Sequence, residues 1–255
     1  MLSAVIITQN EERNIYRCLS SLEDIADEII VVDSGSSDAT EAICRSHGAT
    51  FVHHDWEGFS LQKNYADTLA QGEWILSVDA DEALSPALRQ ELLSLKQRGF
   101  EHGCAYKFSR LTNFCGSWIH HCGWYPDAKV RLFECGTAQW VGAFHERIDF
   151  QPQPRIVSLH ADLLHYSYYT TDEFLSRQAK YARLGGEEAY RRGKHCSGVA
   201  LVAKTVWAFL RSYLLHRGFL DGSAGLRVCR MNGRYTYMKY STLRQLSKQS
   251  SSCPK

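Results

Sequence analysis

Two aspartates one residue apart follow an apolar run and carry the clearest chemistry in this sequence. The run Trp74-Ile75-Leu76-Ser77-Val78 is typical of a buried strand, and Asp79-Ala80-Asp81-Glu82 comes directly after it. Ligands of open α/β sheets bind at the carboxyl ends of the strands. Crowded carboxylates repel each other unless a cation lies between them, and their hard oxygens suit Mg²⁺ or Mn²⁺ bridging a diphosphate. We therefore expect a metal site here, although an acidic turn in solvent has the same pattern.

Polar residues also follow two earlier apolar runs, at residues 8–12 and 33–38. Asp33 could accept a hydrogen bond from a base N–H or a ribose hydroxyl, and the glycine and serines after it allow the backbone to approach a ligand closely. The alternative is a helix-capping turn that Ser37 or Asp38 completes. Three strand ends would then present polar side chains on one rim of a sheet.

The elements that must position these strand ends alternate along the first hundred residues. The alternation of short β-rich runs with polar helical stretches predicts a parallel sheet covered by helices. Strands are expected at residues 4–8, 28–33, 50–53 and 74–78. Helices are expected at residues 11–22, 38–47, 61–71 and 85–96, the last one capped by Ser85 with Pro86 at its first position.

The remaining chain changes character twice. Aromatic-rich extended segments at residues 105–110, 129–134 and 156–165 are expected to extend the sheet. Helical patterns follow at residues 171–192, 198–217 and 223–247. The sequence thus predicts an α/β domain in residues 1–168, with a mixed sheet flanked by helices, and a helical region in residues 169–255.

Charge separates the two parts of the chain, although the whole carries a net +1. Residues 1–150 hold 12 basic and 22 acidic side chains, a net of −10, whereas residues 151–255 hold 17 and 6, a net of +11. The basic part predicts contact with an anionic membrane surface or a phosphate-bearing lipid, against the alternative of a solvated helical surface. Residues 199–217 are apolar but contain Lys204 and Arg211, which suits a helix lying in the headgroup region or a core helix better than a membrane span.

The cysteines and the N-terminus favour a cytoplasmic protein. Nine cysteines form no Cys-x-x-Cys pair, and the first residues lack the basic region of an export signal. Free thiols are therefore expected. Cys115, His120, His121 and Cys122 lack the paired spacing of a structural zinc site.

The ordered motifs resemble glycosyltransferase family 2, whose members have the GT-A nucleotide-diphospho-sugar fold. The matching elements are residues 8–12, the Val-Val-Asp-Ser-Gly-Ser-Ser-Asp run, Gln62-Lys63-Asn64 and Asp79-Ala80-Asp81-Glu82. The resemblance implies an inverting transfer from a nucleotide-sugar, with Asp33 on uridine and the donor held by metal through Asp79 and Asp81. It also implies that the donor site includes the side chains of Thr8, Asn10, Glu12, Lys63 and Asn64.

Inversion requires a general base on the side of the anomeric carbon opposite the leaving diphosphate. Glu146 is the first candidate, because it follows a glycine-containing loop beside Trp140, whose ring could stack on a sugar. Asp127 is the alternative. His165 could complete the metal site from a strand end, as could His145, although an ordinary buried histidine has the same pattern.

A finer resemblance covers the whole length and concerns the acceptor. Further matching segments are Gly58-Phe59-Ser60, His145-Glu146-Arg147, His165-Tyr166-Ser167 and residues 218–222. They are similar to the bacterial lipopolysaccharide core heptose β-1,4-glucosyltransferases, which implies UDP-glucose as donor, a lipid A core acceptor and a peripheral position on the inner face of the cytoplasmic membrane. A polyprenyl-linked or protein acceptor and a non-catalytic nucleotide-sugar-binding protein stay open as alternatives. No nucleic acid partner is expected.

Overall fold

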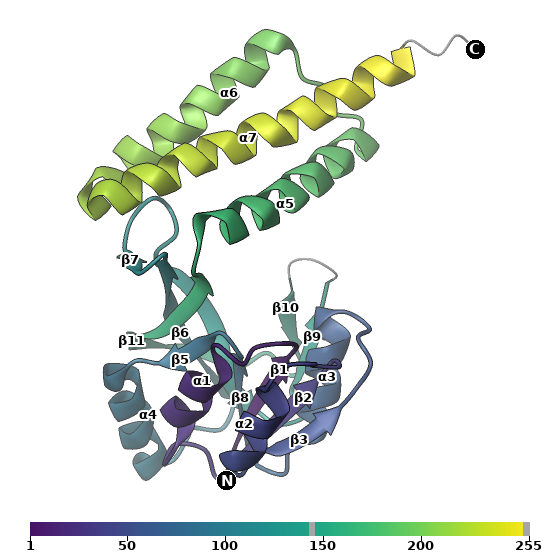
Figure 1. Cartoon of the computed structure of the whole chain (residues 1–255). Coiled ribbons are helices and arrows are strands. Elements are labelled where there is room, and N and C mark those ends of the chain that lie inside the picture. Colours follow the sequence, from purple (N-terminus) through teal and green to yellow (C-terminus); the bar gives the residue numbers. More distant parts are fainter. Residues whose placement is uncertain (143–145, 252–255) are drawn as a thin grey trace. The chain divides into compact units, whose positions relative to one another are not determined.

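The computed structural model of the chain, in which residues 1–142 and 146–251 are described, divides into two compact units (Figure 1). The first unit comprises residues 1–111 and 127–166. The second comprises residues 112–126 and the chain from Ser167 onward. Residues 112–126 therefore belong with the C-terminal helices, although they lie in the middle of the sequence.

The first unit is built on a mixed sheet in the order β3-β2-β1-β4-β8-β6-β11-β5. Its parallel part contains β1 (Leu2–Thr8), β2 (Glu28–Asp33), β3 (Thr50–His53) and β4 (Trp74–Asp79). The strands that extend it are β5 (Glu82–Leu84), β6 (Cys104–Phe114), β8 (Asp127–Glu134) and β11 (Arg155–Tyr168). In the register of the sheet Thr8 lies beside Asp33, and Ile7 lies beside Asp79. The predicted polar strand ends therefore do share one edge.

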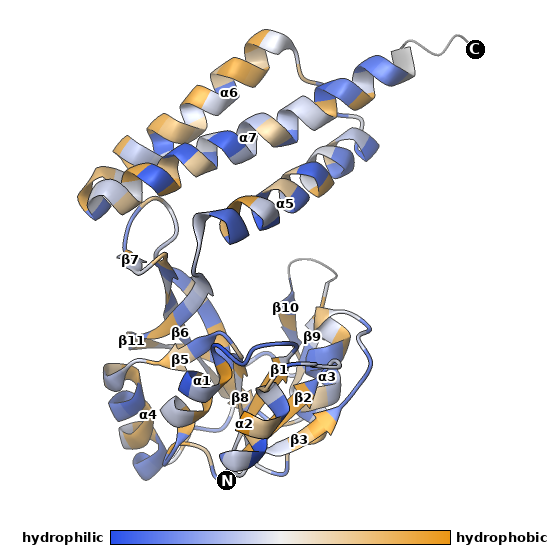
Figure 2. Cartoon of the chain, in the orientation of Figure 1, coloured by the Kyte–Doolittle hydropathy of each residue, from blue (hydrophilic) through white to orange (hydrophobic). Residues whose placement is uncertain are grey.

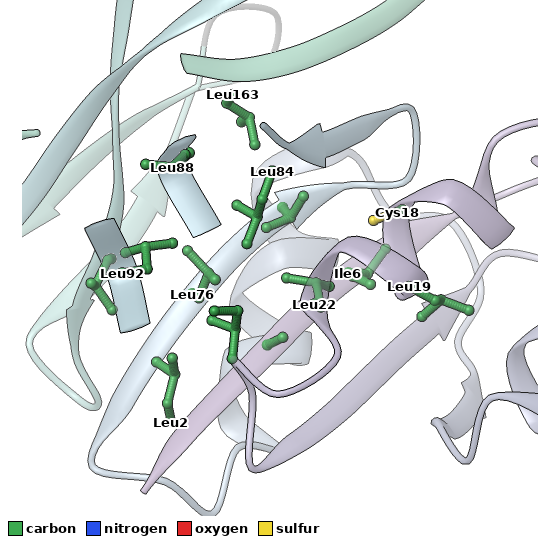
Figure 3. Close-up of a cluster of buried hydrophobic side chains, with 14 of the residues drawn as sticks. Leu2, Ile6, Cys18, Leu19, Leu22, Leu76, Leu84, Leu88, Leu92 and Leu163 are labelled. Carbon is green, nitrogen blue, oxygen red and sulfur yellow. The ribbon is translucent and has the colours of Figure 1, made fainter. Parts of the chain in front are cut away.

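Helices and a hairpin cover the two faces of this sheet. The helices are α1 (Ile15–Leu22), α2 (Thr40–Ser46), α3 (Phe59–Thr68) and α4 (Pro86–Arg98), and the hairpin is β9 (Ala138–Val141) with β10 (Arg147–Phe150). Leu2, Ala4 and Ile6 of β1 point into a cluster with α1 and α4 (Figure 3), whereas Val5 points into a cluster with α3 and the hairpin. This alternation is the period of two that a strand buried on both faces requires.

The sequence predicted the parallel strands closely and missed the shortest ones. β2 and β3 have the predicted bounds, and the Ser85 hydroxyl accepts a hydrogen bond from the Leu88 N–H as expected for a cap. β5, β7, β9 and β10 were not predicted, because these short antiparallel strands lie outside the alternating strand–helix pattern from which the parallel strands were predicted. β5 is functionally relevant, since its register places Glu82 beside His165 of β11.

The second unit consists mainly of helices. They are α5 (Thr171–Arg191), α6 (Gly198–Leu210), the π-helical segment η1 (Arg211–Leu215), the 3₁₀ turn η2 (Gly218–Asp221) and α7 (Gly222–Ser251), with β7 (Ser117–Ile119) paired to the end of β6. α7 packs against both α5 and α6. Cys122 N–H donates to the His216 carbonyl, and the Ser212 hydroxyl donates to the Cys122 carbonyl, so the 112–126 loop is fastened to the helices.

Two adjacent glycines of α5 are expected to respond differently to an added methyl group. A Cβ at Gly186 would lie 2.7 Å from the Lys239 carbonyl oxygen of α7, whereas a Cβ at Gly185 would meet only side-chain atoms of Lys239 and Tyr235, at 3.4 Å. We expect Gly186→Ala to lower the free energy of unfolding by about 1–3 kcal/mol, because the α5–α7 backbones must separate. Gly185→Ala is the matched control and should change it by less than about 1 kcal/mol, since helix propensity favours alanine. Denaturant titration followed by far-UV circular dichroism measures both, and equal losses would contradict the close packing at Gly186.

Candidate active site

Asp79 ends β4 between two cationic side chains. Its Oδ1 lies 2.8 Å from Lys63 Nζ, and its Oδ2 lies 2.7 Å from Arg131 Nη2. Both cationic residues are almost fully buried, while the Asp79 side chain is 27% exposed. Burial by itself would raise the pKa of Asp79, but Arg131 and Lys63 hold this pKa well below its usual value. Asp79 is therefore ionised and can only accept hydrogen bonds.

A buried acid fixes the position of Arg131. Glu82 has no side-chain exposure, and its two oxygens lie 2.8 and 2.9 Å from Arg131 Nη2. Glu82 also accepts a hydrogen bond from the Asp79 N–H, which ties the strand end to β5. Burial by itself would lower the pKa of Arg131, but the negative charges of Asp79 and Glu82 outweigh it and raise this pKa above its usual value. Arg131 therefore keeps its charge and holds Asp79 in place.

Arg110 joins this network to one of the two predicted base candidates. Arg110 donates to Glu82 over 3.3 Å and, through Nε and Nη2, to Asp127 Oδ2 over 3.0 and 2.7 Å. Asp127 Oδ1 also lies 3.0 Å from Lys129 Nζ. Burial raises the pKa of Asp127, but Arg110 and Lys129 outweigh it, so the pKa lies below its usual value. A carboxylate stabilised in this way is a weak proton acceptor, which disfavours Asp127 as the base.

Asp81 and His165 form a second pair in the same unit. His165 Nε2 lies 3.2 Å from Asp81 Oδ2. Burial raises the pKa of Asp81, but the hydrogen bond and the electrostatic interaction with His165 outweigh it, so the pKa lies below its usual value. The sequence predicted His165 as a possible metal ligand at a strand end. β11 in fact continues to Tyr168, and its register with β5 places His165 beside Glu82, the residue after Asp81.

The Asp81–His165 pair has the geometry of two neighbouring ligands of one cation. Two atoms each about 2.1 Å from an ion and at a right angle to each other are about 3 Å apart. Within residues 1–142 and 146–251, no group of three or more His, Cys, Asp and Glu side chains could hold a metal ion. Asp81 and His165 are therefore the side chains that would hold a divalent ion here. Asp79 does not fit its predicted role as a direct ligand, since both its oxygens are ion-paired.

The predicted donor residues of the β1–α1 loop hold two loops together. Asn10, at a φ of 55°, accepts from the Ser37 N–H, and Glu12 accepts from the Ala39 N–H. In return the Asn10 and Glu12 N–H groups donate to the side chains of Ser36 and Asp38. Asn10 and Glu12 thus shape the rim of the sheet through loop-to-loop bonds. A direct contact of either residue with a donor remains a prediction.

Asp33 and Thr8 lie buried at the adjoining strand ends. Asp33 is 3% exposed, and its Oδ2 accepts from the N–H groups of Gly35 and Ser36, while its Oδ1 accepts from the Ser36 hydroxyl. Asp33 thus closes a turn within its own loop. This turn differs from the helix-capping turn expected from Ser37 or Asp38, because α2 has Ala39 at its N-cap and no side-chain cap bond, although Asp38 Oδ1 accepts from the Thr40 N–H. Thr8 Oγ1 is buried without a hydrogen-bond partner among the described residues, which leaves a polar atom available next to Asp33.

Asn64 positions the β9 strand rather than facing a ligand. Its Nδ2 donates to the Trp140 carbonyl and its Oδ1 accepts from the Trp140 N–H, each over 2.8 Å. The Trp140 indole N–H donates to Asp67 over 2.9 Å, and its ring lies 4.6 Å from Lys63 Nζ. Trp140 is only 6% exposed, so the predicted stacking of its ring on a sugar is not supported. Both side chains instead fix the wall beside Lys63.

Asp67 makes stability depend on pH. Burial raises the pKa of Asp67 to about 7, although the Trp140 bond and Lys63 lower it in part. The folded state thus binds a proton that the unfolded chain has lost, and stability falls as pH rises from about 4 to about 7. Asp67→Asn mimics the protonated acid, so the difference in unfolding free energy between variant and parent should move in the variant's favour by up to about 4 kcal/mol over that range. Denaturant titrations at several pH values measure it, and a constant difference would contradict the assignment.

A cavity of about 360 Å³ lies in the first unit, and Asp81, Asp127 and His165 are not among the described residues that line it. Asp79, Lys63, Arg131, Arg110 and Glu146 all line it, together with Lys129, Arg147 and four apolar residues of β8 and β10 and Trp140. Asp79 and Glu146 thus line the same space. His145 lies outside the described residues. The roles of Arg110 and Glu82 follow from the packing of β5, β6 and β8 and had no sequence signal beyond the acidic run.

The parallel strands with polar carboxyl ends and the acidic site are typical of α/β proteins that bind a ligand at the strand ends. A comparison of sequences gives the family. The glycosyl transferase family 2 profile matches residues 3–143. The chain therefore belongs to glycosyltransferase family 2, and its first unit has the GT-A fold with the second unit as a C-terminal helical extension.

Curated relatives cover almost the whole chain. An uncharacterised glycosyltransferase of Rickettsia bellii is 28% identical over 97% of this chain and 87% of its own length. The lipopolysaccharide core biosynthesis glycosyltransferase LpsC of Rhizobium meliloti is 27% identical over 96% of this chain and 92% of its own length. Among solved structures, glucosyl-3-phosphoglycerate synthase of Mycobacterium tuberculosis in complex with Mn²⁺, UDP-glucose and phosphoglyceric acid is 22% identical, with a TM-score of 0.36 over 44% of each chain.

Proposed function

We propose that this chain is an inverting, metal-dependent hexosyltransferase that uses a UDP-sugar, with glucose as the expected hexose and the inner-core heptose of lipopolysaccharide as the expected acceptor. One observation carries the proposal: Glu146 and the Lys63–Asp79–Arg131 cluster line a single cavity at the carboxyl end of β4. Such an arrangement can bind an anionic donor and accept a proton from a hydroxyl in the same space. LpsC, a relative of similar length, supports the class of acceptor.

Different residues of this chain are proposed to bind the donor hydroxyls, the diphosphate, the metal ion and the uridine. Asp79, ionised and held by two cations, accepts hydrogen bonds from donor hydroxyls. Lys63 and Arg131 contribute positive charge to the cavity that receives the diphosphate. Asp81 and His165 would hold Mg²⁺ or Mn²⁺, which when bound offsets the charge that develops on the leaving UDP. The predicted contact of Asp33 with uridine would use the Asp33–Thr8 strand ends.

Glu146 is the proposed general base. In the transfer, the acceptor oxygen forms a bond to the anomeric carbon while the bond from that carbon to the diphosphate oxygen breaks. The hydroxyl proton passes to the Glu146 carboxylate, and the electron pair of the broken bond leaves with UDP. Glu146 is partly buried and lines the cavity with Asp79, whereas both oxygens of Asp127 are ion-paired. The geometry therefore favours Glu146 over Asp127.

Mixing purified full-length chain with single donors and defined acceptors tests the proposal. We expect addition of one hexose, seen by mass spectrometry, from UDP-glucose to a heptose-terminated lipopolysaccharide core. UDP-galactose, a polyprenyl-linked sugar and a peptide are the comparison donor and acceptors. Transfer to one of these instead would keep the enzyme class and change the substrate. Absence of transfer from any UDP-sugar would overturn the proposal.

Removal of divalent ions tests the metal separately. Treatment with EDTA should abolish transfer, because an ion held by Asp81 and His165 would no longer offset the charge that develops on the leaving UDP. Mg²⁺ or Mn²⁺ should restore it, and the ratio of the two rates gives the preference. Full activity in EDTA would show that the Asp81–His165 pair acts without an ion.

A further inference from the structure

One side of α6 is apolar and exposed along its whole length. The exposed side chains are Val199 at 82%, Val202 at 60%, Val206 at 50%, Trp207 at 57% and Leu210 at 38%. Positions 199, 202, 206 and 210 recur every three or four residues, so they share one face of a helix. We call this set, with Ala203, the outer face of α6. Figure 2 shows how strongly apolar α6 is beside α5 and α7.

The opposite side of α6 is already occupied by packing within the second unit. Leu201 is buried against α5 and α7 residues such as Ala189 and Leu243. Farther along, Ser212 is 4% exposed, donates to the Cys122 carbonyl and accepts from Asn232 of α7. The outer face is therefore the side of the helix that points away from the helical core, where a soluble helix normally carries polar residues.

Cations border the outer face. Lys204 and Arg211 are exposed and lie next to it on the same helical hairpin, and Arg217 follows beside the exposed Phe219 and Leu220. From residue 198 to residue 251 the sequence contains nine basic residues and one acidic residue, Asp221. The Asp221 carboxylate is bound by His121 and is nearly buried, so it does not offset the exposed positive charge.

We propose that the outer face of α6 inserts into the headgroup region of an anionic bilayer, with the helix lying in the membrane plane and Lys204, Arg211 and Arg217 contacting lipid phosphates. The proposal deepens the proposed function, since it names the surface that would bring the enzyme to a lipid-linked acceptor. A second copy of the chain is a poorer occupant, because pairing two outer faces would bring their bordering cations together without exposed acids to match them.

A helix in the membrane plane fits the structure better than a spanning one. Gly198–Leu215 is long and apolar enough to cross a membrane by length and composition. Crossing the membrane would, however, break the hydrogen bonds of the Ser212 hydroxyl with Cys122 and Asn232. It would also place the charges of Lys204 and Arg211 in the hydrocarbon region. In-plane insertion keeps these contacts and buries only the apolar face.

Trp207 makes the two orientations distinguishable. It lies near the middle of Gly198–Leu215, so a spanning helix would place its ring at the bilayer centre, whereas an in-plane helix keeps it near the headgroups. We expect Trp207 fluorescence to shift to shorter wavelength with phosphatidylglycerol–phosphatidylethanolamine vesicles. Quenching should be strongest with bromines placed high on the lipid chain, and Trp207→Phe should remove the signal. Strongest quenching by bromines at the chain ends would overturn the in-plane orientation.

Variants test the surface by co-sedimentation with the same vesicles, without donor or acceptor. The double substitution Val206→Glu and Leu210→Glu should weaken binding by at least about tenfold, as should Lys204→Gln with Arg211→Gln. Ile156→Glu, at an exposed apolar residue of the first unit, is the matched control and should leave binding unchanged. Phosphatidylcholine vesicles should bind weakly.

Two results would overturn the surface assignment. One is equal binding by the parent and the Val206–Leu210 variant, both with parental circular dichroism. The other is a parent dimer in sedimentation velocity that this variant dissociates, with no binding to vesicles. Transfer to a detergent-dispersed acceptor is measured separately, so loss of catalysis and loss of docking remain distinguishable.

Discussion

Asp81→Asn is expected to lower the rate of hexose transfer about a thousandfold or more while the protein stays folded. The substitution keeps the shape of the side chain but removes the charge that would bind a divalent ion beside His165. Loss of the ion forfeits several kcal/mol of transition-state stabilisation, and about 4 kcal/mol corresponds to three powers of ten. Single-turnover transfer at saturating UDP-sugar measures the rate of the chemical step. Calorimetric titration of the protein with Mn²⁺ in the presence of UDP measures the affinity for the ion.

Asp24→Asn is the matched control for this prediction. Asp24 is 82% exposed and pairs with Arg89 on the surface. It is not among the cavity-lining residues and does not belong to β4. It should retain parental transfer and metal-dependent UDP binding. Parental activity of Asp81→Asn in the presence of the ion would remove Asp81 from the metal site. Weaker UDP binding in EDTA as well would instead indicate a direct contact of Asp81 with the donor.

Glu146→Gln carries the second large effect, on kcat. We expect a loss of about 10²- to 10⁴-fold, because glutamine keeps the size of the side chain but cannot take the acceptor proton. The KM for the donor should change little, since donor contacts are assigned to other residues. The acidic limb of the pH–rate profile should also disappear, and a merely structural role for Glu146 would not remove it.

Asp127→Asn separates the two base candidates. Both carboxylate oxygens of Asp127 are ion-paired, with Arg110 and Lys129. Removal of this charge should therefore lower the free energy of unfolding and have little effect on kcat. We expect less than about a tenfold change in kcat with an intact pH profile. The reverse pattern, with a large kcat loss for Asp127→Asn and a small one for Glu146→Gln, would transfer the role of base to Asp127.

The parallel half of the sheet could be predicted from sequence because its signals are local. Apolar runs such as Glu28–Asp33 are buried on both faces, and a cap such as Ser85 acts on N–H groups three residues away. The hairpin of β9 and β10 could not be predicted in this way. Asn64 and Asp67 of α3 hold Trp140 in that hairpin across more than seventy residues, and no periodicity records such a contact.

Sequence by itself determined the family, the acidic run at the end of β4 and the opposite charges of the two parts of the chain. These properties depend on residue type and order along the chain. Tertiary structure decided which neighbours each acid has. It placed the buried side chains of Lys63 and Arg131 beside Asp79. It also set His165 beside Asp81 and paired Asp127 with Arg110, while Glu146 lines the cavity. The physical reason is that the charge state and availability of a carboxylate depend on burial and on neighbouring charges, which strands distant in sequence bring together.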